Sequence, residues 1–181
     1  MYNNTITSSK IIETERLYLR PITEHDTLDF FELDSNPDVH TFLGQRPITR
    51  IEQSQAMILS IMEQYNISGF GRLAIVDKLT DHFIGWTGLK YAKGLKSTTP
   101  YYDLGTRIKE QYWGKGYASE AAMASLEYGF KNLKLNEICA VANVKNMASN
   151  TILTKIGMQV ESTFEYNGDW LNWYVKKNPY L

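Results

Sequence analysis

The most informative stretch of this sequence is Gln111-Tyr112-Trp113-Gly114-Lys115-Gly116-Tyr117-Ala118. It follows a run over 101–108 that predicts a strand, and it precedes small and apolar residues spaced along one face of a predicted helix. The first N–H groups of a helix have no partner within it and carry the positive end of the helix dipole, so they attract phosphate. Glycines at this point let the main chain approach an anion closely. The stretch therefore predicts a strand-to-helix junction that can hold a phosphate group, with Lys115 as an additional positive charge.

Three other interpretations of the two glycines can be compared with the sequence. A tight turn in which they serve geometry alone remains open. A P-loop requires G-x-x-x-x-G-K-[ST], but Lys115 is followed by Gly116 and Tyr117. A dinucleotide fingerprint requires a third glycine at position 119, which is Ser119, and the first strand of a βαβ unit. The remaining interpretation is a pyrophosphate site for a cofactor with no metal requirement.

Outward from this junction, the hydrophobic periodicity predicts a mixed α/β chain. A first strand is expected over 11–20, followed by a helix that begins at the T-x-x-D capping pattern of Thr23 and ends at Asn36-Pro37. The remaining helices are expected over 51–65, after Gly116, and over 147–156, and the remaining strands over 72–77, 83–91, 101–108, 138–143, 158–166 and 170–176. The order β-αα-βββ-α-β-α-ββ is not the regular alternation of a doubly wound fold. With 181 residues, the chain is expected to form a single domain over 1–181.

The composition excludes several classes of function. The formal net charge is −1 and there is no run of basic residues, which argues against nucleic acid as a partner. The first ten residues are polar, and no apolar stretch approaches the length of a membrane span, so we expect a cytoplasmic protein without a membrane partner. The single Cys139 lies in an apolar run and is expected to pack rather than to act as a nucleophile. His25, His40 and His82 match no metal-ligand spacing, so no metal is expected.

Five segments together resemble the GNAT superfamily of acyl-CoA-dependent N-acetyltransferases, in the branch that includes the ribosomal-protein N-terminal (RimJ/RimL-type) acetyltransferases. Gln111-x-x-Gly114-x-Gly116 reproduces the family signature Q/R-x-x-G-x-G/A. The other segments, in chain order, are similar to the opening strand, the central hairpin, the E-I-G strand and the last helix of that branch: residues 13–21, Phe83–Leu89, Asp103-Leu104-Gly105, and Asn146–Ser149 with Lys155–Met158.

The resemblance implies a GNAT fold, with a central twisted, mostly antiparallel mixed sheet of about six to seven strands and about four helices. It also implies that the backbone of the 111–118 loop binds the pyrophosphate of acetyl-CoA, the acyl-donor substrate. The cofactor-binding residues expected from it are Ile108, whose main-chain N–H falls near the family's oxyanion contact, Asn146, and Gln111, Tyr112, Trp113, Gly114, Lys115, Gly116, Tyr117 and Ala118.

Acetyl transfer to nitrogen requires a neutral amine and a proton for the departing thiolate. Asp103 is the first candidate for the base because it occupies the position where relatives carry glutamate; an exposed strand carboxylate without a role is the alternative. Glu13 and Glu161 are less favoured candidates. Many relatives have, at the position of Leu153, a tyrosine that acts as the general acid. Its absence here leaves Ser149 as the candidate acid. Ser149 can equally serve the first helical turn, and Asn146 can serve as its N-cap.

The expected function is therefore direct transfer of an acetyl group from acetyl-CoA to a primary amine, with a protein N-terminal amine as the favoured acceptor. A small-molecule amine such as a polyamine or an aminoglycoside is one alternative acceptor, and a non-catalytic acyl-CoA-binding module is an alternative function. The protein is expected to be a monomer or a homodimer. Most aromatic residues on the predicted strands and loops are expected to pack, while one or two line the acceptor pocket; the set is Trp86, Tyr91, Trp113, Tyr166, Trp170 and Trp173.

Overall fold

The computed structural model describes residues 12–96 and 98–181. These residues form eight strands, four α-helices and two short 3-10 turns. In chain order the elements are β1 (Ile12–Glu13), β2 (Leu17–Pro21), a 3-10 turn (Glu24–Asp26), α1 (Thr27–Ser35), α2 (Ile51–Ser68), β3 (Arg72–Asp77), β4 (Phe83–Ala92), β5 (Tyr101–Ile108), a 3-10 turn (Glu110–Tyr112), α3 (Tyr117–Lys131), β6 (Glu137–Asn143), α4 (Met147–Lys155), β7 (Gln159–Tyr166) and β8 (Asp169–Lys177).

All eight strands belong to one sheet with the order β1-β2-β3-β4-β5-β6-β8-β7. Every neighbouring pair is antiparallel except β5 and β6, which are parallel. The β4–β5 pairing is continuous from Gly85↔Ile108 to Ala92↔Tyr101, whereas β5 and β6 share only the register pair Asp103↔Cys139. The sheet is therefore two antiparallel halves that are joined at a single point.

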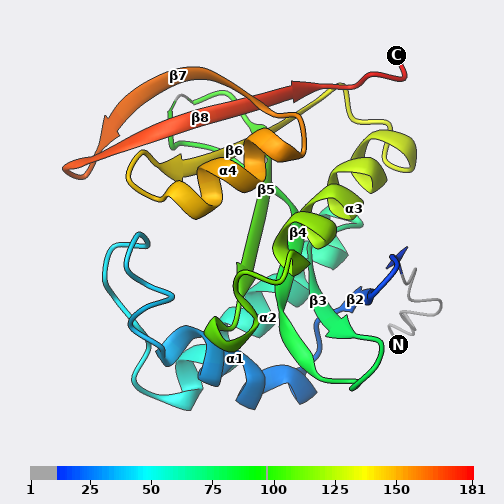
Figure 1. The fold of residues 1–181 in the computed structure, drawn as a ribbon, viewed down its shortest axis with the longest axis vertical. Coiled ribbons are helices and arrows are strands. Elements are labelled where there is room, and N and C mark those ends of the chain that lie inside the picture. The colour runs from blue at the N-terminus through cyan, green and yellow to red at the C-terminus, as the bar shows by residue number, and fades with distance from the viewer. Residues whose placement is uncertain (1–11, 97) are drawn as a thin grey trace.

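The helices cover both faces of the sheet (Figure 1). α1 and α2 pack on one face through a core cluster that includes Phe30, Leu33 and Ile58. α3 and α4 pack on the other face, where Leu126 and Ile156 share a cluster with Leu104 of β5 and with residues of β6. Alternate residues of a strand point to opposite faces, so the odd-numbered residues of β5 face α1 and α2 while the even-numbered ones face α3 and α4.

The mixed α/β architecture predicted from the sequence is confirmed, with one more strand than expected. The strand expected over 11–20 begins outside the described residues, and within them it is two strands, because the chain turns at Thr14, whose N–H donates to Leu17 O at 3.0 Å. The helix expected from Thr23 starts as a 3-10 turn, with the Thr23 N–H bound to the Asp26 carboxylate at 2.8 Å. No helix in the described part of the chain combines the length and apolarity that a membrane span needs.

Candidate active site

The divergence of β5 from β6 positions the candidate site. Their only paired residues, Asp103 and Cys139, lie near the start of each strand, so the two parallel strands separate toward their C-terminal ends. Figure 1 shows β5 running away from β6 and β8. β5 leads into the predicted phosphate loop and α3, and β6 leads into α4. Both helix N-termini therefore lie at the edge where neighbouring strands separate, which is where open α/β sheets bind ligands.

The loop after β5 presents a run of unpaired backbone amides. The Trp113 N–H donates to Glu110 O at 2.9 Å, and the next bonded amide is that of Glu120, which donates to Gly116 O at 3.1 Å. Between them, the amides of residues 114–119 have no hydrogen-bond partner among the described residues. Gly114 (φ 72°) and Gly116 (φ 82°) adopt the left-handed conformation that turns successive N–H groups to one side. This arrangement can hold an anion with backbone groups alone.

The N-terminus of α4 provides a comparison within the same edge. There the Asn146 side chain accepts a hydrogen bond from the Ser149 N–H at 3.1 Å, as expected for an N-cap. α3 has no side-chain cap. Of the two helix starts at this edge, only the one in the loop that the sequence singled out lacks a side-chain cap.

Three side chains, those of Trp113, Arg16 and Tyr117, hold this loop in place. The Trp113 indole Nε1–H donates to Ile108 O at 2.8 Å, which fixes the loop to the end of β5. Arg16 donates from Nη1 to Lys115 O at 2.9 Å and pairs with the Glu120 carboxylate at 2.7 Å. The Tyr117 hydroxyl donates to Asp77 at 2.9 Å. The loop that carries the unpaired amides is therefore held by contacts with β5, with Arg16 and with β3.

The main-chain N–H of Ile108 points away from β4. Successive residues of an antiparallel strand direct their main-chain groups alternately to one neighbour and to the other. Lys109 N–H donates to Ile84 O at 2.9 Å, so Arg107 and Lys109 face β4, whereas Thr106 and Ile108 face the side from which β6 has separated. This orientation is the one required of a donor to a ligand between the two strands.

Asp103 lies on the α1/α2 face of β5 and is not a free carboxylate. Its Oδ2 pairs with Arg72 of β3, and Arg72 also donates to the main-chain oxygen of Asp103 at 2.9 Å. Gly105 makes this approach possible, because a Cβ there would lie 2.8 Å from Nη2 of Arg72. The Arg72 guanidinium also stacks over Trp86, 5.2 Å from the ring centroid.

Comparison with known proteins gives the family. The family described as acetyltransferase (GNAT) domain matches residues 16–159. The chain belongs to the GNAT acetyltransferase family. An uncharacterised N-acetyltransferase of Bacillus subtilis (strain 168), YoaA, is 34% identical over 83% of this chain and 84% of that protein.

Two solved structures show how widely acceptors vary on this fold. The RimL ribosomal L7/L12 α-N-protein acetyltransferase in complex with coenzyme A superposes with a TM-score of 0.77, at 18% identity, over 93% of this chain and 98% of that one. The spermidine N-acetyltransferase of Vibrio cholerae in complex with CoA and spermine superposes with a TM-score of 0.74, at 17% identity, over 91% and 97%. Both likenesses show the GNAT fold, and neither selects an acceptor for this chain.

The remaining residues that the sequence analysis considered for catalysis in this GNAT acetyltransferase lie in different surroundings. Glu13 lies on β1, at the far edge of the sheet from β5, and pairs with Lys78 at 3.2 Å. Glu161 lies at an irregularity of β7 and pairs with Lys96 at 2.9 Å. Cys139 is buried on β6, and burial raises the pKa of its thiol to about 12. Ser149 is half-buried in the first turn of α4.

Several residues beside the opening escaped the sequence analysis. Arg16 was quoted only as part of a motif, although it anchors the loop. Arg107 of β5 pairs with Asp34 at the end of α1, and its guanidinium lies 5.0 Å from the centroid of the Trp86 ring. His40 was considered only as a metal ligand, but it approaches Asp34. Arg16 and Asp34 could be seen in the sequence as charged residues within predicted elements. Their partners Glu120 and Arg107 are distant in sequence, so the pairs could not be recognised.

Proposed function

We propose that this GNAT acetyltransferase binds acetyl-CoA between the separating ends of β5 and β6 and transfers the acetyl group directly to a primary amine. The observation that carries the proposal is the run of unpaired amides over 114–119 at the mouth of that opening. A diphosphate offers several acceptor oxygens to such a run, and the dipole of α3 adds favourable electrostatics. Lys115, with Nζ 5.4 Å from the Tyr112 ring centroid, adds a positive charge to the same loop.

The same placement assigns roles to the remaining groups. The Ile108 N–H would donate to the thioester oxygen, where negative charge develops as the amine attacks. Ser149 and Asn146, on the opposite wall, would lie toward the sulfur and the pantetheine, with Ser149 as the proton donor to the thiolate. The buried Cys139 thiol, with its raised pKa, is a poor nucleophile, which supports transfer without a covalent intermediate.

We propose a protein N-terminal amine as the acceptor in preference to a polyamine. A polyamine carries several positive charges, and each needs an anionic or polar partner when it leaves water. Three carboxylates near the opening already pair with cations of the chain itself: Asp103 with Arg72, Asp34 with Arg107, and Glu161 with Lys96. A single amine at the end of a peptide requires no further carboxylate.

Intact mass spectrometry tests the proposal. Short peptides with free N-termini, spermidine and an aminoglycoside are each incubated with the protein and acetyl-CoA, and CoA binding is measured separately by calorimetry. Acetylated peptide together with CoA binding is the expected result. Transfer to spermidine alone would overturn the acceptor, CoA binding without any transfer would favour a non-catalytic acyl-CoA-binding module, and absence of CoA binding would overturn the whole proposal.

A further inference from the structure

Four buried polar atoms without a hydrogen-bond partner gather around Arg107. They are Oδ2 of Asp34, both ring nitrogens of His40 and Nε1 of Trp86. Arg107 connects these groups, because its guanidinium pairs with Oδ1 of Asp34 and lies over the Trp86 ring. Unsatisfied buried polar groups are costly, so their concentration at one place indicates a site that a polar partner completes.

His40 and Asp34 are arranged as a base and its orienting carboxylate. Nε2 of His40 lies 3.6 Å from Oδ1 of Asp34. This distance is too long for a hydrogen bond, but the negative charge of Asp34 favours the neutral tautomer with its proton on Nε2, which leaves a lone pair on Nδ1. Burial and then the charge of Arg107 lower the pKa of His40, although Asp34 opposes the shift. The imidazole is therefore neutral near pH 7 and free to accept a proton.

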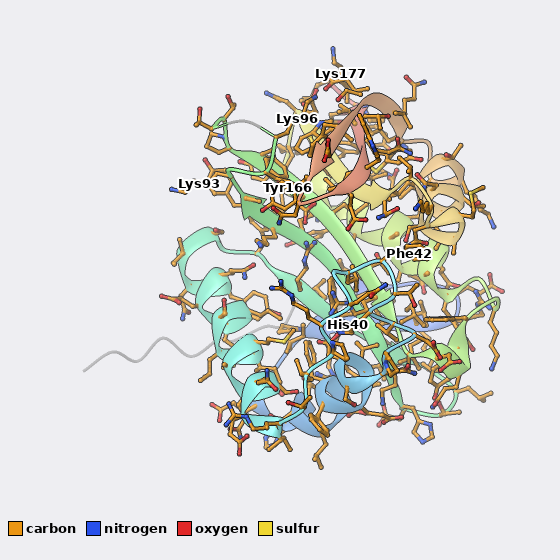
Figure 2. The ribbon with its side chains drawn as sticks, turned by 90° about the vertical axis from the view of Figure 1, so that its left-hand side faces the viewer. His40, Phe42, Lys93, Lys96, Tyr166 and Lys177 are labelled. Atoms are coloured by element: carbon orange, nitrogen blue, oxygen red, sulfur yellow. The ribbon has the colours of Figure 1, made fainter. Side chains whose placement is uncertain are left out.

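The pair lies beside the proposed reaction centre. Arg107 is the β5 residue between Thr106 and Ile108, whose main-chain N–H groups face the opening, and its side chain is on the face that α1 and α2 cover. Figure 2 shows His40 and Phe42 on the connection between α1 and α2, on the same side of the molecule as Tyr166 of the β7–β8 hairpin.

Asp34 is fully buried and His40 is 7% exposed, and their sequence neighbours line a cavity. A cavity of about 340 Å³ lies between the end of α1 and the loop after β5, and its lining includes Leu33 and Val39, the residues that immediately precede Asp34 and His40. The imidazole itself does not line this cavity, so a proton reaches it only through a bridging water or a shift of the chain around residue 39.

We propose that His40, oriented by Asp34, accepts the proton that the acceptor amine loses during acetyl transfer. This inference rests on the proposed acetyl-transfer function. The amine lone pair forms the new C–N bond, the carbonyl electron pair moves to oxygen, and an N–H proton passes to Nδ1 of His40. When the carbonyl re-forms, the C–S electron pair leaves with sulfur and the thiolate takes a proton from water, directly or through Ser149, which then regains its proton from that water. The imidazolium releases its proton to solvent.

The charged groups around His40 suit this role. Asp34 from α1 and Arg107 from β5 face the ring, and the Arg72–Asp103 pair lies beyond Trp86. Asp34 stabilises the imidazolium once it forms, while Arg107 disfavours a protonated amine in the same place. Asp103 has its own cation in Arg72, whereas His40 has a free nitrogen.

The experiment compares kcat/KM for the acceptor amine across pH, at saturating acetyl-CoA, in the wild type, His40→Gln and His82→Gln. His82 is an exposed histidine in the β3–β4 turn and serves as the matched control. In the wild type, kcat/KM should fall with acidification below the ordinary histidine range, in addition to the titration of the amine itself. His40→Gln should lose about 100-fold in rate and should lack this additional fall, with the CoA-induced rise in Tm unchanged.

Chemical rescue separates proton transfer from a purely structural role. His40→Ala leaves space for a free imidazole, which should restore part of the rate in proportion to its neutral form. Wild-type rates in His40→Gln, or a uniform loss with an unchanged pH profile and no rescue of His40→Ala, would overturn the inference. If the wild type itself transfers acetyl to no acceptor, the proposed function fails instead.

Discussion

Arg16 and Glu120 join the first strands of the sheet to the first turn of α3. Nη2 of Arg16 lies 2.7 Å from Oε2 of Glu120, and Nε donates to the same oxygen at 2.7 Å. The other carboxylate oxygen accepts from the main-chain N–H of Arg16 at 2.9 Å. The same guanidinium reaches Lys115 O, so one side chain holds both the loop and the helix that follows it. The clamp lies where the chain leaves the sheet between β1 and β2.

Replacing Arg16 should weaken CoA binding more than it weakens the fold. Arg16→Gln removes the ion pair and the bond to the loop carbonyl, so the amides over 114–119 are no longer held in one orientation. Because Arg16 is partly exposed, we expect a loss of about tenfold in affinity, or about 1.4 kcal/mol. Calorimetric titration with CoA measures it. Lys131→Gln is the control, since it removes the Lys131–Glu127 pair at the other end of the same helix; an equal loss in both variants would contradict the clamp.

The clamp should also give stability a defined dependence on pH. Burial raises the pKa of Glu120, but hydrogen bonds from Thr14 and Arg16 outweigh it, and the pKa is lowered overall. A carboxylate with a lower pKa in the folded state stabilises the fold above its unfolded pKa of about 4.3, and this contribution is lost as the pH falls through the folded value. Urea unfolding of wild type and Glu120→Gln should therefore show a difference in free energy at pH 7 that shrinks toward pH 3. A constant difference would contradict the linkage.

The backbone of this protein could be predicted from its sequence to a large extent. The strands expected over 72–77 and 101–108 have the predicted bounds, because alternating residues and flanking turn residues mark both ends. Gly114 and Gly116 predicted a tight strand-to-helix junction, and both have the positive φ angles that such a junction requires. The extra strand was missed, because the turn at Thr14 is stabilised by contacts with α3 that local patterns do not record.

The side-chain pairs at the site could not be predicted in the same way. Asp103 was recognised by its position in a motif, but its partner Arg72 is 31 residues away. Arg107 and Asp34 are 73 residues apart. Neither pair leaves a periodic or compositional signal, since each depends on how β3, β5 and α1 come together in space. The chemistry of a carboxylate depends on such partners. The sequence therefore suggested Asp103 as the base but did not indicate that Arg72 pairs with it.

Asp103→Asn distinguishes the base predicted from the sequence from the one inferred from the structure. The substitution leaves the mostly buried Arg72 without its carboxylate, so we expect a loss of stability of about 1–3 kcal/mol. If His40 takes the proton, turnover falls less than in His40→Gln and the pH profile keeps its wild-type shape. Steady-state rates across pH, with unfolding measured in urea, provide the test. A pH profile that loses its acidic limb in Asp103→Asn would return the role to Asp103.

Gly116→Asp should abolish CoA binding through charge and geometry together. Gly116 has φ 82°, and a Cβ there would lie 3.3 Å from Nη2 of Arg16, so an aspartate places a carboxylate among the amides that would receive the diphosphate. Gly168→Asp is the matched control, because Gly168 has φ 86° in the β7–β8 turn and nothing within 4 Å of its Cβ position. Both substitutions impose the same left-handed strain, about 1–2 kcal/mol, so their effects on Tm should be similar. Only Gly116→Asp should lose the rise in Tm that CoA produces. If both variants keep that rise, the 114–119 amides are not the diphosphate site, and if both lose it, the loss reflects strain rather than charge.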